Sequence, residues 1–157
     1  MNRPPTVWDR VVSLLIWIVA GSFLVLSLTF LTVLYQFVRP DRVQVLDRWY
    51  CRLQLALTFN RQRHWVHPDV DDETQYIFIQ NHSSHLDHVA MDTATPHFKQ
   101  GIELDTHFEY PFYGGFMKAR GTLPVRKDRA GALEALRTAM RAELEAGHPS
   151  LGFPEGQ

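Results

Sequence analysis

The longest apolar stretch of the chain lies close to its N-terminus. The 28 residues from Val11 to Val38 carry no charged side chain, and 21 of them are apolar. With a rise of 1.5 Å per residue, a helix of this length extends about 42 Å, more than the roughly 30 Å hydrocarbon core of a bilayer. The apolar part of a cleaved signal peptide is only about 7 to 15 residues long. The pattern therefore predicts a single transmembrane helix over residues 11–38.

A second helical pattern follows Pro40. Between residues 42 and 58, apolar side chains recur at helical spacing with polar ones between them. The apolar positions are Leu46, Trp49, Tyr50, Leu53 and Leu57, and the polar ones are Asp47, Arg48, Arg52 and Gln54. An amphipathic helix of this kind is typical of the headgroup layer of a membrane and also of a helix that faces a protein core. We expect residues 1–60 to form a membrane anchor and residues 61–157 a separate domain.

From residue 61 onward, short β-prone runs alternate with helical patterns. We expect strands at 76–80, 101–104, 122–125 and 150–153, and helices at 86–93, 111–119 and 130–146. Asp128 is placed to cap the last helix and Gly147 to end it. This alternation predicts an α/β domain with a partly parallel sheet flanked by helices.

The distribution of charge separates the two parts of the chain. Residues 1–60 hold six Arg and three Asp (net +3), whereas residues 61–157 hold ten Lys or Arg and fourteen Asp or Glu (net −4). An acidic domain lacks the basic surface that nucleic acid requires, so no nucleic-acid partner is expected. Arginines follow the apolar segment more densely than they precede it: Arg39, Arg42, Arg48 and Arg52 against Arg3 and Arg10. This bias predicts that the bulk of the chain faces the cytoplasm, attached to the inner membrane if the protein is bacterial.

The densest polar cluster, residues 80–88, directly follows the first predicted strand. Ligands of open α/β sheets bind at the carboxyl ends of strands, so this position favours a functional role. His82 and Asp87 can pair if His82 lies in the loop and Asp87 in the first helical turn. Ser84-x-x-Asp87 matches a capping box, which provides that geometry but also allows Asp87 to be no more than a helix cap.

Three other interpretations use the same residues. A metal site is one, with His82, His85 and His88 joined by Asp87 or Asp92. A serine nucleophile is another, although the chain contains no Gly-x-Ser-x-Gly sequence. The third is a surface loop whose histidines are only polar.

Two further clusters follow along the chain. The first is basic, with a net charge of +4 across residues 118–129 that comes from Lys118, Arg120, Arg126, Lys127 and Arg129 against Asp128. Arg126 and Lys127 end a strand-like segment and are suited to gripping a phosphate, or else they form a solvated face. The second is Phe153-Pro154-Glu155-Gly156, in which a strand delivers the carboxylate of Glu155 into a turn.

In this order, and behind a membrane helix, the three clusters resemble the glycerolipid acyltransferase family, typified by the 1-acyl-sn-glycerol-3-phosphate acyltransferases. The resemblance covers roughly residues 76–157. The matching motifs are Asn81-His82-x4-Asp87, then Pro111-Phe112-Tyr113-Gly114 with Gly121-Thr122-Leu123-Pro124-Val125, and finally residues 153–156. Lys127 stands where the family usually has an arginine, and Gln157 stands where its third motif usually continues with threonine. The fourth motif is absent, so we expect the acyltransferase domain to be incomplete at its C-terminus.

The resemblance implies a role for each candidate residue. His82 would be the general base and Asp87 would orient it, while Arg126, Lys127, Glu155 and Gly156 would bind the phosphate of the acceptor. It implies no cofactor and no metal, with acyl-CoA or acyl-carrier protein as co-substrate and membrane lipids as partners. The expected function is therefore acyl transfer to a lysophospholipid in phospholipid biosynthesis. The alternatives are a truncated, inactive relative that binds lipid and a membrane-anchored metal hydrolase.

Overall fold

The computed structural model describes residues 4–71, 73–84, 86–126 and 130–153. Its helices are α1 (Val7–Leu34), α2 (Gln44–Leu57), α3 (Asp87–Ala94), α4 (Tyr113–Arg120) and α5 (Ala132–Glu145). The strands are β1 (Ile77–Ile79), β2 (Gln100–Leu104), β3 (Leu123–Val125) and β4 (Ser150–Gly152), and two 3₁₀ helices are η1 (Pro40–Val43) and η2 (Asp105–Glu109). Every predicted strand and helix is present within a few residues of its expected bounds, which confirms the α/β class.

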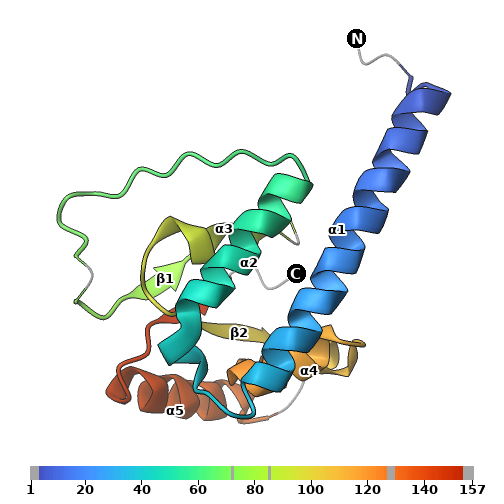
Figure 1. Ribbon diagram of the computed structural model, residues 1–157. Helices are drawn as coiled ribbons and strands as arrows, with labels where there is room; N and C mark the ends of the chain where they lie inside the picture. The colour runs from blue at the N-terminus through green and yellow to red at the C-terminus, as the bar shows by residue number, and fades with distance from the viewer. Residues whose placement is uncertain (1–3, 72, 85, 127–129, 154–157) are drawn as a thin grey trace.

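The four strands form one sheet in the order β1-β4-β2-β3. All three neighbouring pairs are parallel, with Phe78 opposite Leu151 and Ile102 opposite Leu123. Because parallel strands end at the same edge of a sheet, the segments that follow them are brought together there. In the view of Figure 1, α5 runs below the strands, and α2 and α3 lie above α5.

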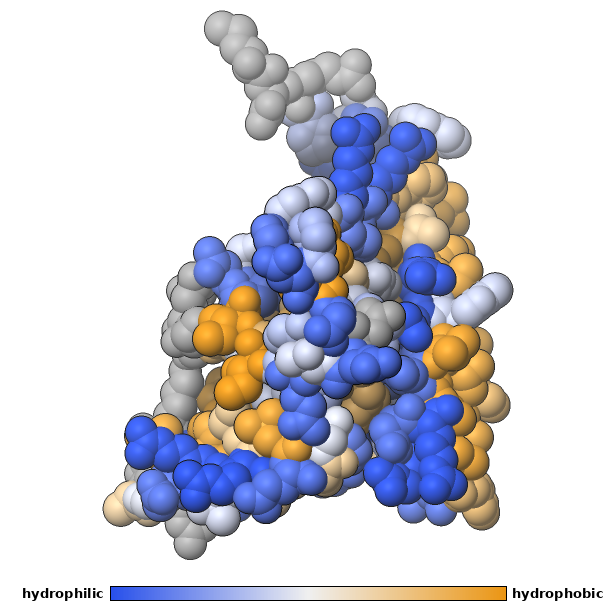
Figure 2. All heavy atoms as spheres, turned by 90° about the vertical axis from the view of Figure 1, so that its left-hand side faces the viewer, coloured by the Kyte–Doolittle hydropathy of each residue, from blue (hydrophilic) through white to orange (hydrophobic). Residues whose placement is uncertain are grey.

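Helix α1 begins four residues earlier than the sequence pattern predicts. Thr6 and Asp9 form a capping box: the Thr6 hydroxyl accepts from the Asp9 amide at 3.2 Å, and the Asp9 carboxylate accepts from the Thr6 amide at 2.7 Å. Within the described residues, α1 is the one helix long and apolar enough to cross a membrane. Its N-terminal half projects away from the other elements in Figure 1, and Figure 2 shows hydrophobic residues in a band down one side of the molecule.

The hydrophobic core joins the N-terminal helices to the α/β domain. The last turns of α1 pack on α4, and α2 packs on α3. The buried core residues are Leu28, Leu31, Tyr35, Tyr50, Cys51, Leu55, Val89, Phe116 and Met117. The end of α1 and the inner side of α2 therefore share one core with the helices that support the sheet.

Helix α2 presents one face to the core, as the core-facing interpretation of its sequence predicts, while a place in the headgroup layer stays a prediction. Asp47 and Gln54, which the pattern places among the polar positions, are buried against the domain. Leu46 and Trp49 are exposed, Trp49 by 60%. The inner face tolerates Asp47 because that carboxylate has buried partners, whereas the apolar outer face faces away from the core.

Helix α5 differs from its prediction at the start and agrees at the end. Its N-cap is Gly131, with φ of +80°, and Asp128 lies outside the described residues. The helix ends at Glu145, and Gly147, with φ of +90°, carries the left-handed turn that follows, as the sequence predicts. This helix packs on β3 and β4.

Candidate active site

His82 and Asp87 meet at the carboxyl edge of the sheet. His82 lies in the loop after β1, and Asp87 is the first residue of α3. The His82 Nδ1 atom is 3.1 Å from Asp87 Oδ2, and the two side chains are 28% and 15% exposed. A carboxylate can only accept a hydrogen bond, so this contact assigns the imidazole proton to Nδ1 and points Nε2 away from Asp87. The pairing predicted from the sequence is confirmed.

Asp87 is held by the loop that it faces. Its Oδ2 atom also accepts from the amides of Ser83 at 2.7 Å and Ser84 at 2.8 Å. Partial burial acts to raise the pKa of Asp87, but the amides of Ser84 and Ser83 and the contact with His82 outweigh it and lower that pKa. Asp87 is therefore an ionised acceptor that can support a positively charged imidazole.

The capping box expected at this helix forms only in part. The Asp87 carboxylate reaches back to the Ser84 amide, as the pattern requires, but the Ser84 hydroxyl accepts from Leu86 N at 3.2 Å. The N-cap of α3 is Leu86, so the prediction of Ser84 in that position is wrong.

The other strands bring their own residues to this edge. Phe153, which follows β4, lies against the His82 imidazole with ring centroids 4.6 Å apart. Arg126, which follows β3, pairs with Asp105 after β2 through a contact of 3.0 Å between Nε and Oδ2. The prediction that Arg126 binds phosphate stays a prediction. The sequence analysis missed Asp105, which its position directly after a predicted strand could have indicated. Lys127, Glu155 and Gly156 lie outside the described residues.

One member of the basic cluster has a different environment. Arg120 is only 8% exposed, and it pairs with Asp47 and Asp92. Its inclusion among residues of a phosphate-gripping or solvated cluster is therefore wrong. The sequence did not reveal this because neither carboxylate is near Arg120 along the chain.

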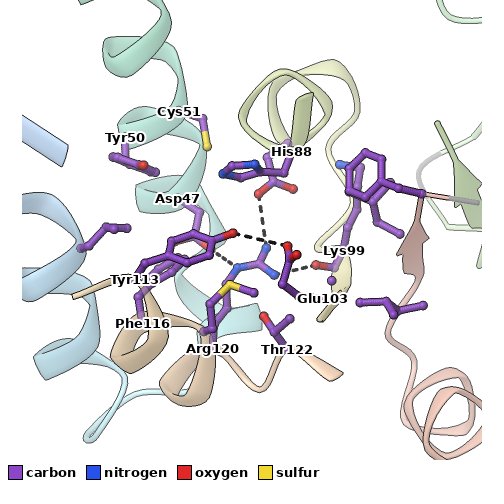
Figure 3. Close-up of a pocket in the computed structure, with 17 residues that line it drawn as sticks. Asp47, Tyr50, Cys51, His88, Lys99, Glu103, Tyr113, Phe116, Arg120 and Thr122 are labelled. Carbon is purple, nitrogen blue, oxygen red and sulfur yellow. Dashed lines mark hydrogen bonds and ion pairs between the residues drawn. The ribbon is translucent and has the colours of Figure 1, made fainter. Parts of the chain in front are cut away.

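A small cavity of about 60 Å³ lies near the pair formed by His82 and Asp87 (the dyad), between the sheet and helices α1 to α4. Figure 3 shows His88, Glu103 and Tyr113 directed toward this interior together with Arg120. Burial lowers the pKa of His88, which favours a neutral imidazole there. Phe153 also lines the cavity, so the ring that touches His82 separates the edge of the sheet from this interior.

The side chains of His82 and His88 have different neighbours, whereas the metal-site interpretation requires them to bind one ion. His82 is bound to Asp87, whereas the His88 ring lies 6.2 Å from that of Tyr113. Among the described residues, no group of three or more His, Cys, Asp or Glu side chains is arranged to hold a metal ion. His85 lies outside those residues, and the absence of a metal stays a prediction.

Comparison with known proteins gives one family. A family model described as Acyltransferase matches residues 58–157, more than half of the chain. No curated protein and no solved structure gives a significant match. The matched region contains His82, Asp87, Asp105, Arg126 and Phe153, which are the residues gathered at the carboxyl edge of the sheet.

Proposed function

Because this chain belongs to the acyltransferase family, we propose that it transfers a fatty acyl group from an acyl thioester to the hydroxyl of a lysophospholipid such as 1-acylglycerol-3-phosphate. The observation that carries the proposal is the 3.1 Å contact between His82 and an Asp87 carboxylate that two loop amides also hold. The acyl donor is a thioester of coenzyme A or of acyl-carrier protein, and the pathway is phospholipid biosynthesis.

The dyad suits general-base catalysis. Nε2 of His82 takes the proton of the acceptor hydroxyl as the hydroxyl oxygen attacks the thioester carbonyl carbon. The tetrahedral intermediate then collapses, the carbon–sulfur bond breaks, and the imidazolium returns its proton to the leaving thiolate. Asp87 holds the ring through Nδ1 and stabilises its positive charge during this cycle. The products are an ester and a free thiol, so the step needs neither an oxidant nor a metal.

The phosphate of the acceptor is assigned to the far end of the same edge. Arg126 is 54% exposed, so its guanidinium is accessible to a ligand. Neighbouring strands lie about 4.8 Å apart, which puts the ends of β1 and β3 roughly 14 Å apart across the order β1-β4-β2-β3. A glycerol phosphate and two side chains can bridge that distance. Lys127, Glu155 and Gly156 are proposed to complete this subsite on the strength of the family resemblance.

The N-terminal helices give the proposed reaction its location. Helix α1 is 28 residues long and exposes Leu14, Trp17 and Leu26 by more than half. An apolar groove of about 340 Å³ runs between α1 and the outer face of α2. These features support a single-pass membrane protein in which α2 lies in the headgroup layer on the cytoplasmic side, where an amphiphilic acceptor is concentrated.

The proposed function is tested with His82→Ala. The full chain is incubated with an acyl thioester and 1-acylglycerol-3-phosphate, and the released thiol and the diacyl product are both measured. We expect kcat to fall by about 10²- to 10⁴-fold, because general-base contributions are of this size. The melting temperature should stay close to that of the wild type, since His82 is at the surface edge of the sheet.

Asp87→Asn separates orientation from helix capping. Asparagine keeps much of the capping capacity of aspartate. If Asp87 only caps the helix, this change should cost the enzyme little activity, whereas the loss of an orienting carboxylate should lower kcat at least about tenfold.

Retention of more than a tenth of the wild-type kcat by His82→Ala would refute the assignment of the base.

A further inference from the structure

A buried charge cluster lies between the N-terminal helices and the helix that carries Asp87. Arg120, the last residue of α4, donates from Nη1 to the carbonyl of Lys99 at 2.7 Å. Its Nε lies 3.2 Å from Asp47 Oδ2 on α2, and its Nη2 lies 3.4 Å from Asp92 Oδ2 on α3. Figure 3 shows the guanidinium at the centre of these contacts. One side chain therefore ties together α2, α3, α4 and the start of β2.

The cluster also reaches the end of α1. The Tyr35 hydroxyl, just after α1, donates to the Asp47 carboxylate. Lys99 is 1% exposed, and its Nζ donates to the carbonyls of His97 at 3.1 Å and Thr95 at 3.4 Å. These two carbonyls belong to the loop directly after α3. Helix α3 is therefore held through Asp92 within the helix and through the Lys99 contacts beyond its C-terminal end.

Helix α3 is too short to absorb a displacement by bending. It has eight residues, and Asp92 is about 7.5 Å along its axis from Asp87. A rotation or shift at Asp92 is consequently transmitted to the first residue of the helix. The contact that this moves is the one between Asp87 and His82, which tolerates little misplacement because catalysis depends on near-attack geometry.

We propose that Asp92, Arg120 and Asp47 are positioning residues that set the orientation of α3 relative to α2 and thereby hold Asp87 against His82. The catalytic part of this inference rests on the proposed function. Asp92 lies five residues after Asp87 on α3, so the two side chains leave the helix about 140° apart around its axis. Its role is to make the geometry of the dyad depend on how the N-terminal helices are seated against the domain.

The test compares Asp92→Asn with a control that also removes a charge. Asparagine keeps the shape of Asp92 and leaves Arg120 its contacts with Asp47 and the Lys99 carbonyl. The control is Arg137→Ala, which breaks the exposed Arg137–Glu134 pair on α5, the helix that packs on β3 and β4. We expect Asp92→Asn to lower kcat about 10- to 100-fold with the KM of both substrates within about twofold of wild type. The control should keep the wild-type kcat.

A double-mutant cycle distinguishes positioning from general weakening. If Asp92 acts through Asp87, then the Asp87→Asn, Asp92→Asn double variant falls no further in kcat than Asp87→Asn alone. If the two losses multiply, Asp92 does not act through Asp87 and the proposal is overturned. An unchanged kcat in Asp92→Asn overturns it as well.

A spectroscopic arm needs no enzymatic activity. In protein labelled with ¹⁵N-histidine, the Nδ1 proton of His82 reports its hydrogen bond to Asp87, and His82→Gln identifies the signal. We expect this proton to move upfield or vanish in Asp92→Asn and to stay in place in Arg137→Ala. If Asp92→Asn does not fold, Asp47→Asn replaces it and should move the signal in the same direction. An unmoved signal refutes the positioning role, whereas a wild-type chain without acyl transfer refutes the proposed function alone.

Discussion

The structure contains two arginine–aspartate arrangements with opposite surroundings. Arg126 and Asp105 meet at the carboxyl edge of the sheet with side chains 54% and 37% exposed. Arg120 and Asp47 meet in the interior with side chains 8% and 5% exposed. Water screens the first pair, so Arg126 can exchange Asp105 for a ligand at little cost. The second pair cannot change partners, because each of its charges depends on the others for solvation.

The buried arrangement balances its charges across four side chains. Asp47 and Asp92 carry two negative charges, while Arg120 and Lys99 carry two positive ones. Burial raises the pKa of Asp47 although Arg120 opposes that rise. Burial acts to lower the pKa of Arg120, but Asp92 and Asp47 together raise it. Both pKa values rise, which favours the charged form of Arg120 but disfavours the charged form of Asp47. The guanidinium interacts with two carboxylates, whereas Asp47 shares its one guanidinium with Asp92.

The largest difference between the two arrangements should appear in stability. Arg120→Met leaves the buried Asp47 and the partly buried Asp92 without their cation, which costs about 3–5 kcal/mol of unfolding free energy. Arg126→Met removes an exposed pair and should cost about 0–1 kcal/mol. Chemical denaturation of both variants in the same detergent measures the difference. Equal losses in the two variants would contradict the contrast drawn here.

The second effect concerns the dependence of stability on pH through Lys99. Burial lowers the pKa of Lys99 from 10.5 to about 8, which corresponds to roughly 3 kcal/mol. Between about pH 8 and 10.5 the unfolded chain holds this proton and the folded chain does not, so the unfolding free energy should rise with pH. Buried tyrosines and Cys51 titrate in the opposite sense, and Lys99→Met provides the reference that isolates the lysine. A wild-type curve parallel to that of Lys99→Met would exclude the effect.

The third effect should appear in substrate binding at the exposed arrangement. If Arg126 grips the phosphate of the acceptor, Arg126→Ala removes a charge-assisted hydrogen bond and raises the acceptor KM about 10- to 100-fold. The donor KM should remain unchanged, because the donor thioester is not assigned to this end of the edge. Steady-state kinetics with each substrate varied in turn checks this. An equal rise in both constants would assign Arg126 to a solvated face or to the donor.

The smallest expected effect concerns the access of solvent to the buried region around Cys51. Cys51 is 2% exposed, and burial, reinforced by Asp92 and Asp47, raises the pKa of its thiol. The thiolate is the reactive form, so a thiol reagent at pH 8 should modify the folded protein only slowly. The same reagent in denaturant should react at once and provides the control. Complete modification of the folded chain within the mixing time would show that solvent reaches the core beside Asp47.

The amino-acid sequence alone determined the elements and the dyad. The alternation of β-prone and helical runs located each of the four strands, and the uncharged run from residue 11 located most of α1. His82 and Asp87 were predictable because they lie five residues apart around one strand end, and a local turn is enough to bring them together. Local spacing controls such contacts, so a pattern along the chain reveals them.

Only the tertiary structure decided the interior. Asp47, Asp92 and Arg120 are separated by 28 residues or more along the chain, and the packing of α2, α3 and α4 brings them together. The sequence therefore placed Arg120 in a surface cluster and Asp47 among polar positions. The pairing of Arg126 with Asp105 likewise required the parallel register of β2 and β3. Contacts of this kind depend on burial and strand order, which residue spacing does not encode.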